Sequence, residues 1–400
     1  MENRIVFDFE NEDYDAFVKF VKKAGLGLNA PVIHIAGSNG KSSTAHLLSS
    51  VYEKAGYRVG LFLNQYFSSP REMISINHEP IKSVDYKKIE AGFSKLFEKF
   101  DCSAFQRVFA IALSYFASNK LDLLIIETGL GGALDATNIR YEDKALSIIT
   151  NISLEHTDLL GTTLSQIANE KSGIFQDRVP VLLGKIDENC KETIVANALA
   201  LSCPISNVDD PHNVSLKHGA TFDYETHIGV ELSSRALYQV PNACLVIEAV
   251  YTLSHRFNVS EEALREGLKA ADLPGHFELS NGILFDVAEN PFAMYGLASS
   301  VGVYAPGDMA HVIFASLKGQ NIAVELPFID NYVNSITITT FDDERARTED
   351  DYFLYAPDYE YAPSFLEAVK DLQSRFPGEL IIVTGSAEFV FDCLSKWRQA

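Results

Sequence analysis

The stretch VIHIAGSNGKSSTAHLL, residues 32–48, contains the most informative pattern of the chain for predicting its fold. An apolar segment, 32–36, leads into the loop Gly37-Ser38-Asn39-Gly40-Lys41-Ser42-Ser43, and a helical pattern follows it. Backbone N–H groups at a helix start bind anions, and glycines let a phosphate approach closely. The stretch therefore predicts a nucleotide-phosphate loop, although Ile35 replaces the first glycine of the common G-x-x-x-x-G-K-[ST] pattern. The alternative is an ordinary glycine turn with a serine-capped helix.

The chain length and charge narrow the class of protein. With 400 residues and 47% hydrophobic content, the chain can build more than one core, so we expect two domains. The 33 basic and 54 acidic residues leave a formal charge of -21. Since a nucleic-acid binder needs a basic surface, we expect no nucleic-acid partner. An anionic ligand must then meet a local cationic pocket.

The cysteines and the first residues indicate the compartment. The five cysteines are scattered, and no pair has the C-x-x-C spacing of a metal or redox site. The beginning, MENRIVFDFENEDYD, is acidic and lacks the apolar core of a signal peptide. No run is long and apolar enough to span a membrane. We therefore expect a cytoplasmic protein with reduced thiols and no membrane partner.

Apolar runs alternate with amphipathic segments, which is typical of a mainly parallel sheet with crossover helices. We expect strands at 32–36, 59–63, 123–127, 146–150 and 179–183. We expect helices at 13–24, 42–55, 86–100, 104–118, 165–172 and 242–254. The pattern breaks up over 187–239, where we expect loops and a few antiparallel strands. It restarts after the turn at Pro274, which predicts domains 1–273 and 274–400.

The loop Gly-Ser-Asn-Gly-Lys-Ser resembles the G-T-N-G-K-[GST] loop of the Mur ligases, which are ATP-dependent amide ligases. Further stretches resemble the folylpolyglutamate synthase/dihydrofolate synthase branch, in the same order. They are FSSPREMISINHEPI (67–81), IIETGLGGALDATNI (125–139), ITNISLEHTDLLGTTLSQIANEKSGIF, LYQVPNA, LPGHFEL, FDVAENP and VTGS. The likeness therefore runs from residue 32 to residue 386.

This resemblance implies an α/β fold and a reaction. It implies an N-terminal P-loop ATPase-like domain with a mainly parallel sheet, and a smaller C-terminal Rossmann-like domain. It also implies transfer of the ATP γ-phosphoryl group to a folate carboxylate, followed by attack of L-glutamate on the acyl phosphate. The substrates would be small molecules, namely a folate or pterin acid and L-glutamate, and the chain a monomer. A second hypothesis within the family is that dihydropteroate is also an acceptor, because the two activities share every motif quoted above.

The resemblance also implies two magnesium ions. Glu127, at the end of an apolar strand, would hold the first ion together with Ser69. His156 would hold the second, with a carbamylated Lys171. A buried amine has a lowered pKa, so its neutral form can add carbon dioxide and become an anionic oxygen ligand. The alternatives are a strand-end acid, a loop histidine and a surface lysine near a helix C-terminus.

The resemblance further predicts the nucleotide contacts. The phosphates would lie on Ser38, Asn39, Gly40, Lys41, Ser42 and Ser43. Gln239, Asn242, His276 and Asp286 would lie near the rest of the nucleotide. Among all these residues Lys41, Glu127, His156 and Lys171 would serve catalysis. The neighbouring Asn290-Pro291 is explained by helix capping alone.

Five positions depart from the branch pattern, and several of them remove positive charge. They are Arg71 and Tyr238 for histidine, Ala133 and His276 for arginine, and Glu289 for histidine. Two further hypotheses therefore stand beside the folate ligase. One is a nucleotide-binding paralogue with impaired catalysis, and the other is a Mur-type ligase for a different carboxylate.

Overall fold

The computed structural model describes residues 12–216, 219–305, 310–356 and 358–399. The first eleven residues, on which the signal-peptide expectation mainly rests, lie outside the described residues. The chain forms two compact units. The first comprises Met1–His212, Tyr224–Val230 and Pro241–Ala271, and the second Asn213–Asp223, Glu231–Val240 and Asp272–Ala400. The predicted division of the ligase domains at 273/274 stays a prediction.

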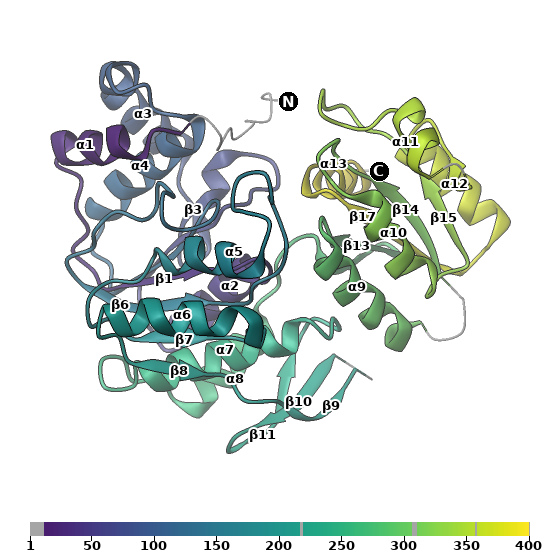
Figure 1. Cartoon of the computed structure of the whole chain (residues 1–400). Coiled ribbons are helices and arrows are strands. Elements are labelled where there is room, and N and C mark those ends of the chain that lie inside the picture. Colours follow the sequence, from purple (N-terminus) through teal and green to yellow (C-terminus); the bar gives the residue numbers. More distant parts are fainter. Residues whose placement is uncertain (1–11, 217–218, 306–309, 357, 400) are drawn as a thin grey trace. The chain divides into compact units, whose positions relative to one another are not determined.

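The N-terminal unit is built on an eight-stranded sheet with the order β4-β3-β2-β5-β1-β6-β7-β8 (Figure 1). Neighbouring strands from β2 to β8 are parallel, whereas β3 and β4 run antiparallel at one edge. The strands are β1 (Val32–Ala36), β2 (Val59–Phe62), β3 (Ile74–Ile76), β4 (Glu79–Pro80), β5 (Leu123–Glu127), β6 (Lys144–Ile149), β7 (Val181–Leu183) and β8 (Ile205–Asn207). The expected mainly parallel sheet is thus confirmed.

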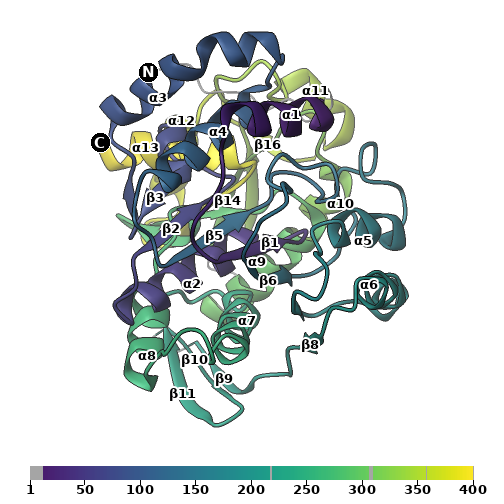
Figure 2. The same cartoon turned by 90° about the vertical axis from the view of Figure 1, so that its left-hand side faces the viewer.

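Helices cover both faces of this sheet. The helices are α1 (Tyr14–Ala24), α2 (Lys41–Lys54), α3 (Ser83–Lys99), α4 (Ala104–Ala117), α5 (Leu164–Ser172), α6 (Glu188–Ala200), α7 (Gln239–Thr252) and α8 (Glu261–Ala270). Figures 1 and 2 both show α1, α3 and α4 on one side of the strands, with α7 and α8 on the other. Phenylalanines such as Phe20, Phe97 and Phe109 form the core on the first side. On the second side α2 packs against α8.

One expectation for this unit is wrong. Residues 188–200, expected in a loop region, form the helix α6. Asp187 caps it by accepting a hydrogen bond from the Asn189 N–H. Cys190, Ile194 and Ala198 are buried along one face, at the four-residue spacing that marks a helix. Apolar residues also lie outside that stripe, such as the exposed Leu199, which is why the amphipathic pattern is weak here.

The C-terminal unit has its own doubly wound sheet, with the order β12-β13-β17-β14-β15-β16. Only β12 is antiparallel to its neighbour. The strands are β12 (His276–Ser280), β13 (Ile283–Val287), β14 (Ala310–Ala315), β15 (Ser335–Ile338), β16 (Glu360–Tyr361) and β17 (Leu380–Gly385). A separate three-stranded sheet has the order β11-β10-β9 and is made of β9 (His212–Ser215), β10 (Ala220–Tyr224) and β11 (His227–Leu232).

Successive side chains of a strand point to opposite faces of the sheet, so each face of the C-terminal sheet packs against different helices. Val312 and Phe314 of β14 pack in a core with α9 and α10. His311 points to the opposite face, where its ring stacks on Phe376 at the end of α12, with ring centroids 4.0 Å apart. The helices are α9 (Pro291–Tyr304), α10 (Ile322–Asp330), α11 (Glu349–Tyr355), α12 (Phe365–Arg375) and α13 (Ala387–Gln399). The expected Rossmann-like arrangement is confirmed. No helix within the described ranges is both long and apolar enough to cross a membrane.

A buried lysine lies in the N-terminal sheet. Lys144 begins β6 and is only 7% exposed. Its Nζ lies 3.1 Å from Nδ1 of the fully buried His34, and it also donates to the Ile174 carbonyl. Burial lowers the pKa of Lys144 to about 7. Burial likewise lowers the pKa of His34, and the neighbouring ammonium lowers it further.

We predict that Lys144 makes stability depend on pH. Its pKa is about 7 in the folded protein and about 10.4 in the unfolded chain. Between these values the unfolded chain binds more protons, so the free energy of unfolding rises with pH, by on the order of 1 kcal/mol per unit. Lys144→Met should flatten this rise between about pH 7.5 and 9 in urea titrations. The exposed Lys95→Met is the control, and equal slopes in the two variants would contradict the assignment.

Candidate functional site

The predicted phosphate loop lies between β1 and α2, and two of its glycines are sterically required. Gly37 has φ +149°, and a Cβ there would lie 1.9 Å from the Thr150 hydroxyl oxygen. Gly40 has φ +78°, and a Cβ there would lie 2.4 Å from the amide oxygen of Asn242. Both positions therefore exclude a side chain. Asn242 of α7 packs directly against the loop.

The segment after β6 holds the loop in place. The Asn39 N–H donates to Oδ1 of Asn151 at 3.0 Å, and the Asn39 carbonyl accepts from Thr150 Oγ1 and Asn151 Nδ2 at 2.6 and 2.8 Å. Ser38 Oγ donates to the Ser153 carbonyl and accepts from the Ser153 N–H, at 3.2 and 2.9 Å. These contacts fix the loop before any ligand binds, which lowers the ordering cost of binding.

Lys41 folds back over its own loop. Its Nζ donates to the Gly37 carbonyl at 2.9 Å and to the Ser38 carbonyl at 3.3 Å. Lys41 is also the first residue of α2 and has an intermediate exposure. The ammonium group therefore sits at a helix N-terminus, where the helix dipole and the free N–H groups already favour an anion.

Ser42 and Glu127 form the most informative pair of the site. Glu127 ends β5 and is 1% exposed. Its Oε1 accepts from Ser42 Oγ at 2.8 Å, and its Oε2 accepts from the Asn64 N–H at 3.1 Å. Burial raises the pKa of Glu127, while Lys41, Asn64 and Ser42 oppose the rise. A carboxylate and a hydroxyl thus meet beside the phosphate loop.

Ser69 lies in a second loop, which leads into a short 3-10 helix. It precedes the 3-10 helix η1 (Pro70–Met73), and Glu72 in that helix accepts from the N–H groups of Phe67 and Ser68 at 2.7 and 2.9 Å. Arg71 donates to the Ile81 carbonyl at 2.7 Å. Within the described residues, Ser69 shares no hydrogen bond with Glu127. The prediction that Ser69 and Glu127 share a metal ion stays a prediction.

Lys171 is buried and ion-paired. It is 1% exposed on α5, and its Nζ lies 2.6 Å from Oε1 of Glu155 and 3.0 Å from the Gly37 carbonyl. Burial lowers the pKa of Lys171, and Glu155 opposes this. Burial alone would raise the pKa of Glu155, but Lys171 and Lys41 hold it below its ordinary value. The surface-lysine alternative is therefore wrong, and Glu155 is a site residue that the sequence reasoning missed. The sequence signal for Glu155 was its position directly before His156, where the pattern of the folylpolyglutamate synthase/dihydrofolate synthase branch has an aspartate.

His156 follows Glu155 directly. Its φ is +42°, in the left-handed region that is uncommon for a residue with a side chain. Its carbonyl accepts from the N–H groups of Leu159 and Leu160, at 2.9 and 2.8 Å, and so closes the turn. The imidazole is exposed. Burial of the ring nitrogens lowers the pKa of His156; Glu155 opposes this fall, and the nearby Lys41 and Lys171 add to it.

The donor set fits a first magnesium ion. Ser42 Oγ and Glu127 Oε1 are hard oxygen ligands side by side, and magnesium often takes few protein ligands and keeps its waters. For a second ion the fit is incomplete, since the Lys171 amine is a cation and only its carbamate would offer oxygen ligands. Across the described part of the chain, no cluster of three or more His, Cys, Asp or Glu side chains is arranged to hold a metal.

The C-terminal unit holds other predicted residues. Asp286, on β13, is 1% exposed, and burial raises its pKa to about 7. Tyr238 donates its hydroxyl hydrogen to Asp286 Oδ2 at 2.5 Å. The His276 ring lies with Nδ1 2.9 Å from the Pro274 carbonyl. Gln239 begins α7 and is 6% exposed. Asp286 and His276 are also register partners across β12 and β13.

The other departures from the branch pattern have local structural roles. The Ala133 N–H donates to the Glu170 carbonyl at 2.8 Å. A Cβ at Gly173 would lie 2.4 Å from the Ala133 side chain, so the two chain segments touch. Glu289 accepts from the Ala387 N–H at 3.4 Å, and Asn290 caps α9 as predicted, accepting from Ala293 at 2.9 Å.

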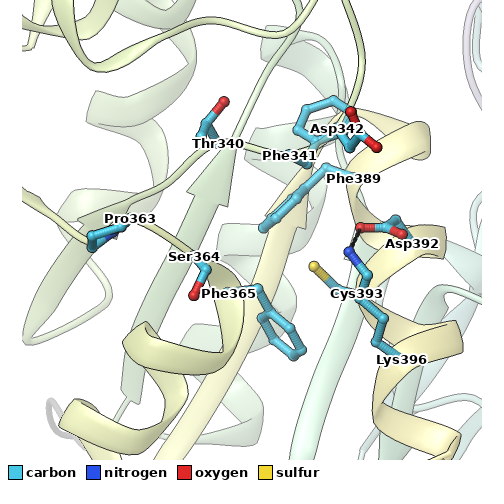
Figure 3. Close-up of a pocket in the computed structure, with 10 residues that line it drawn as sticks. All are labelled: Thr340, Phe341, Asp342, Pro363, Ser364, Phe365, Phe389, Asp392, Cys393 and Lys396. Atoms are coloured by element: carbon cyan, nitrogen blue, oxygen red, sulfur yellow. Dashed lines mark hydrogen bonds and ion pairs between the residues drawn. The ribbon is translucent and has the colours of Figure 1, made fainter.

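A cavity of about 280 Å³ lies in the C-terminal unit, away from these residues (Figure 3). Figure 3 shows the rings of Phe365 and Phe389 toward it, with the Cys393 thiol between the helices α12 and α13. Lys396 is paired with Asp392 at 2.6 Å on its wall. None of the predicted site residues lines this cavity.

Known proteins resemble this chain in sequence and in fold. The Mur ligase middle domain matches residues 35–250. The chain is 28% identical to the dihydrofolate synthase/folylpolyglutamate synthase of Bacillus subtilis (strain 168), covering 95% of this chain and 96% of that protein. It is 29% identical to the protein of the same name from Escherichia coli (strain K12), covering 78% and 74%. The solved structure of E. coli FolC in complex with DHPP and ADP superposes with a TM-score of 0.85 at 26% identity, covering 100% of this chain and 96% of that one.

We predict that Lys41→Ala weakens ATP binding by about 10- to 100-fold, because a hydrogen bond to a charged group contributes roughly 1.5–3 kcal/mol. Isothermal titration calorimetry with a non-hydrolysable ATP analogue measures the change. Lys54→Ala, at the far end of the same helix and exposed, is the matched control and should bind normally. Equal affinities for the Lys41 and Lys54 variants would refute the assignment of the loop.

Proposed function

The chain belongs to the folylpolyglutamate synthase/dihydrofolate synthase family of the Mur ligases, and from that premise we propose that it joins L-glutamate to a folate carboxylate at the expense of ATP. The products are the γ-glutamyl amide, ADP and phosphate. The observation that carries the proposal is the buried Ser42–Glu127 pair, which lies beside a phosphate loop whose Gly37 and Gly40 leave no space for a side chain. The pair supports a phosphoryl-transfer site, and the relatives supply the class of acceptor.

An amide does not form from a carboxylate and an amine in water without activation. Phosphorylation converts the carboxylate into an acyl phosphate, and the amine then displaces phosphate. The chain would contribute position and charge: the loop N–H groups and Lys41 hold the phosphates, and the ordered 150–153 segment keeps the loop rigid. Lys41 would leave the Gly37 and Ser38 carbonyls to reach a phosphate.

Two magnesium ions belong to this proposal. Ser42 and Glu127 would hold the first ion, and Ser69 would join them. His156 and a carbamylated Lys171 would hold the second. When bound, the ions neutralise phosphate charge. Gln239, Asn242, His276 and Asp286 are proposed near the remainder of the nucleotide, and Asn242 already contacts the phosphate loop.

Dihydropteroate is a second proposed acceptor, because both relatives quoted above carry the dihydrofolate synthase name as well. The sequence keeps the phosphate loop, Glu127, His156 and Lys171, which supports an active ligase over an impaired paralogue. On the resemblance alone we also propose a monomer located in the cytoplasm.

We predict phosphate release from ATP only when both a folate and L-glutamate are present. Glu127→Gln should reduce kcat/KM by at least about 100-fold, since it removes a magnesium carboxylate. Glu142→Gln, an exposed acid in the same unit, is the control and should be unchanged. Turnover with no folate or pterin acid, despite tight nucleotide binding, would contradict the function and favour a different carboxylate or a non-catalytic role.

We also predict a carbamate on Lys171. With ¹³C-bicarbonate and Mg²⁺-ATP, the protein should show a carbamate ¹³C resonance that is absent from Lys171→Arg. Forming it requires the amine to release a proton and to leave Glu155, to which it is now paired at 2.6 Å. The exposed Lys185→Arg should keep the resonance. A spectrum without it in the wild-type protein would remove Lys171 from the metal set and leave the phosphate loop assignment intact.

A further inference from the structure

The carboxylate of Asp286 is fixed by two hydrogen bonds to the same oxygen. Tyr238 donates its hydroxyl hydrogen to Oδ2 at 2.5 Å, and the Phe277 N–H donates to it at 2.8 Å. Asp286 is 1% exposed near the carboxyl end of β13. In doubly wound sheets ligands bind beyond this edge of the strands. The orientation of the carboxylate is thus determined by Tyr238 and Phe277.

Tyr238 is itself positioned by helix α9 of the same unit. The preceding residue, Leu237, donates its N–H to Ser300 Oγ at 3.0 Å. A Cβ at Gly296 would lie 3.5 Å from both Cβ and Cδ1 of Tyr238, so the tyrosine lies against the bare backbone of that glycine. Gly296 and Ser300 are one helical turn apart, so they lie on the same face of α9 and together contact Leu237 and Tyr238.

Phe277 has an unusual backbone conformation, and its N–H donates to the same carboxylate. Its φ is +59°, in the left-handed region that a bulky residue rarely adopts. The register between β12 and β13 shifts at this point, between His276 and Glu278. The resulting bulge turns the Phe277 N–H onto Asp286, while its ring is 6% exposed and packs edge-on against Tyr304. Such backbone strain persists where the surroundings hold it, often near functional sites.

The chemistry of the donor differs from the branch pattern. That pattern has histidine at position 238 and arginine at 276, where this chain has Tyr238 and His276. A tyrosine hydroxyl donates one hydrogen bond and stays neutral throughout the physiological range, whereas an imidazole titrates near neutrality. His276 is turned toward the Pro274 carbonyl, with Nδ1 2.9 Å from it. Tyr238 is therefore the side chain that supports Asp286 here.

We propose that Tyr238 is a positioning residue for nucleotide binding, which acts by holding the carboxylate of Asp286 in a fixed orientation through a neutral hydroxyl. This rests on the proposed function, in which Asp286 lies near the nucleotide. Tyr238 replaces the histidine of the branch as the donor, so the chain compensates locally for that departure. The inference explains why Gly296 leaves room for a ring and why Phe277 keeps a strained backbone.

The proposal is tested by measuring the KM for ATP and kcat separately in variants of Tyr238. Tyr238→Phe keeps the ring on Gly296 and removes only the hydroxyl, so the KM for ATP should rise about tenfold with kcat within about twofold. Tyr238→His returns a donor and should recover at least half of the lost affinity. Tyr304→Phe is the control, since this ring contacts Phe277 without a hydroxyl contact to Asp286, and its KM should be unchanged.

An unchanged KM for ATP in Tyr238→Phe, with only a lowered melting temperature, would overturn the proposal and leave the hydroxyl a purely structural bond. Equal losses in Tyr238→Phe and Tyr238→His would also overturn it, because the effect would then come from packing. Failure of the ligase function shows differently, since the wild-type protein would then release no phosphate with folate and glutamate.

Discussion

The hydrogen bond between Ser42 and Glu127 links the two elements on which the N-terminal site depends. Ser42 is the second residue of α2, the helix after the phosphate loop, and Glu127 ends the adjacent parallel strand. Since β1 and β5 are paired in register, with Ile35 opposite Glu127, the sheet itself brings the acid to the loop. Parallel strands place such groups at one edge, where an anionic ligand and its metal can bind together.

The charges around the loop balance within the protein. The Gly37 carbonyl accepts from both Lys41 and Lys171, and Glu155 balances Lys171. The overall charge of -21 therefore says little about this site, because Lys41 and Lys171 both lie at the loop. If Lys41 moves to a phosphate, the contacts of Asn39 with Thr150 and Asn151 still hold the loop.

Much of the fold could be predicted, because the loop, the strand endings and the capped helices are local patterns. Asn290 and its proline cap a helix as expected, and β1 matches its predicted range. The partners of the site could not be predicted, since they depend on distances between remote segments. The Glu155–Lys171 pair and the Tyr238–Asp286 bond join residues 16 and 48 positions apart in the chain. Helix α6 was missed because apolar residues also lie outside its buried stripe.

The most direct test is a crystal structure with a non-hydrolysable ATP analogue and Mn²⁺ in place of magnesium. The account predicts phosphates on residues 38–43 and an anomalous peak within ligand distance of both Ser42 Oγ and the Glu127 carboxylate. Nucleotide bound elsewhere, or bound to this loop with no metal peak beside Glu127, would contradict it.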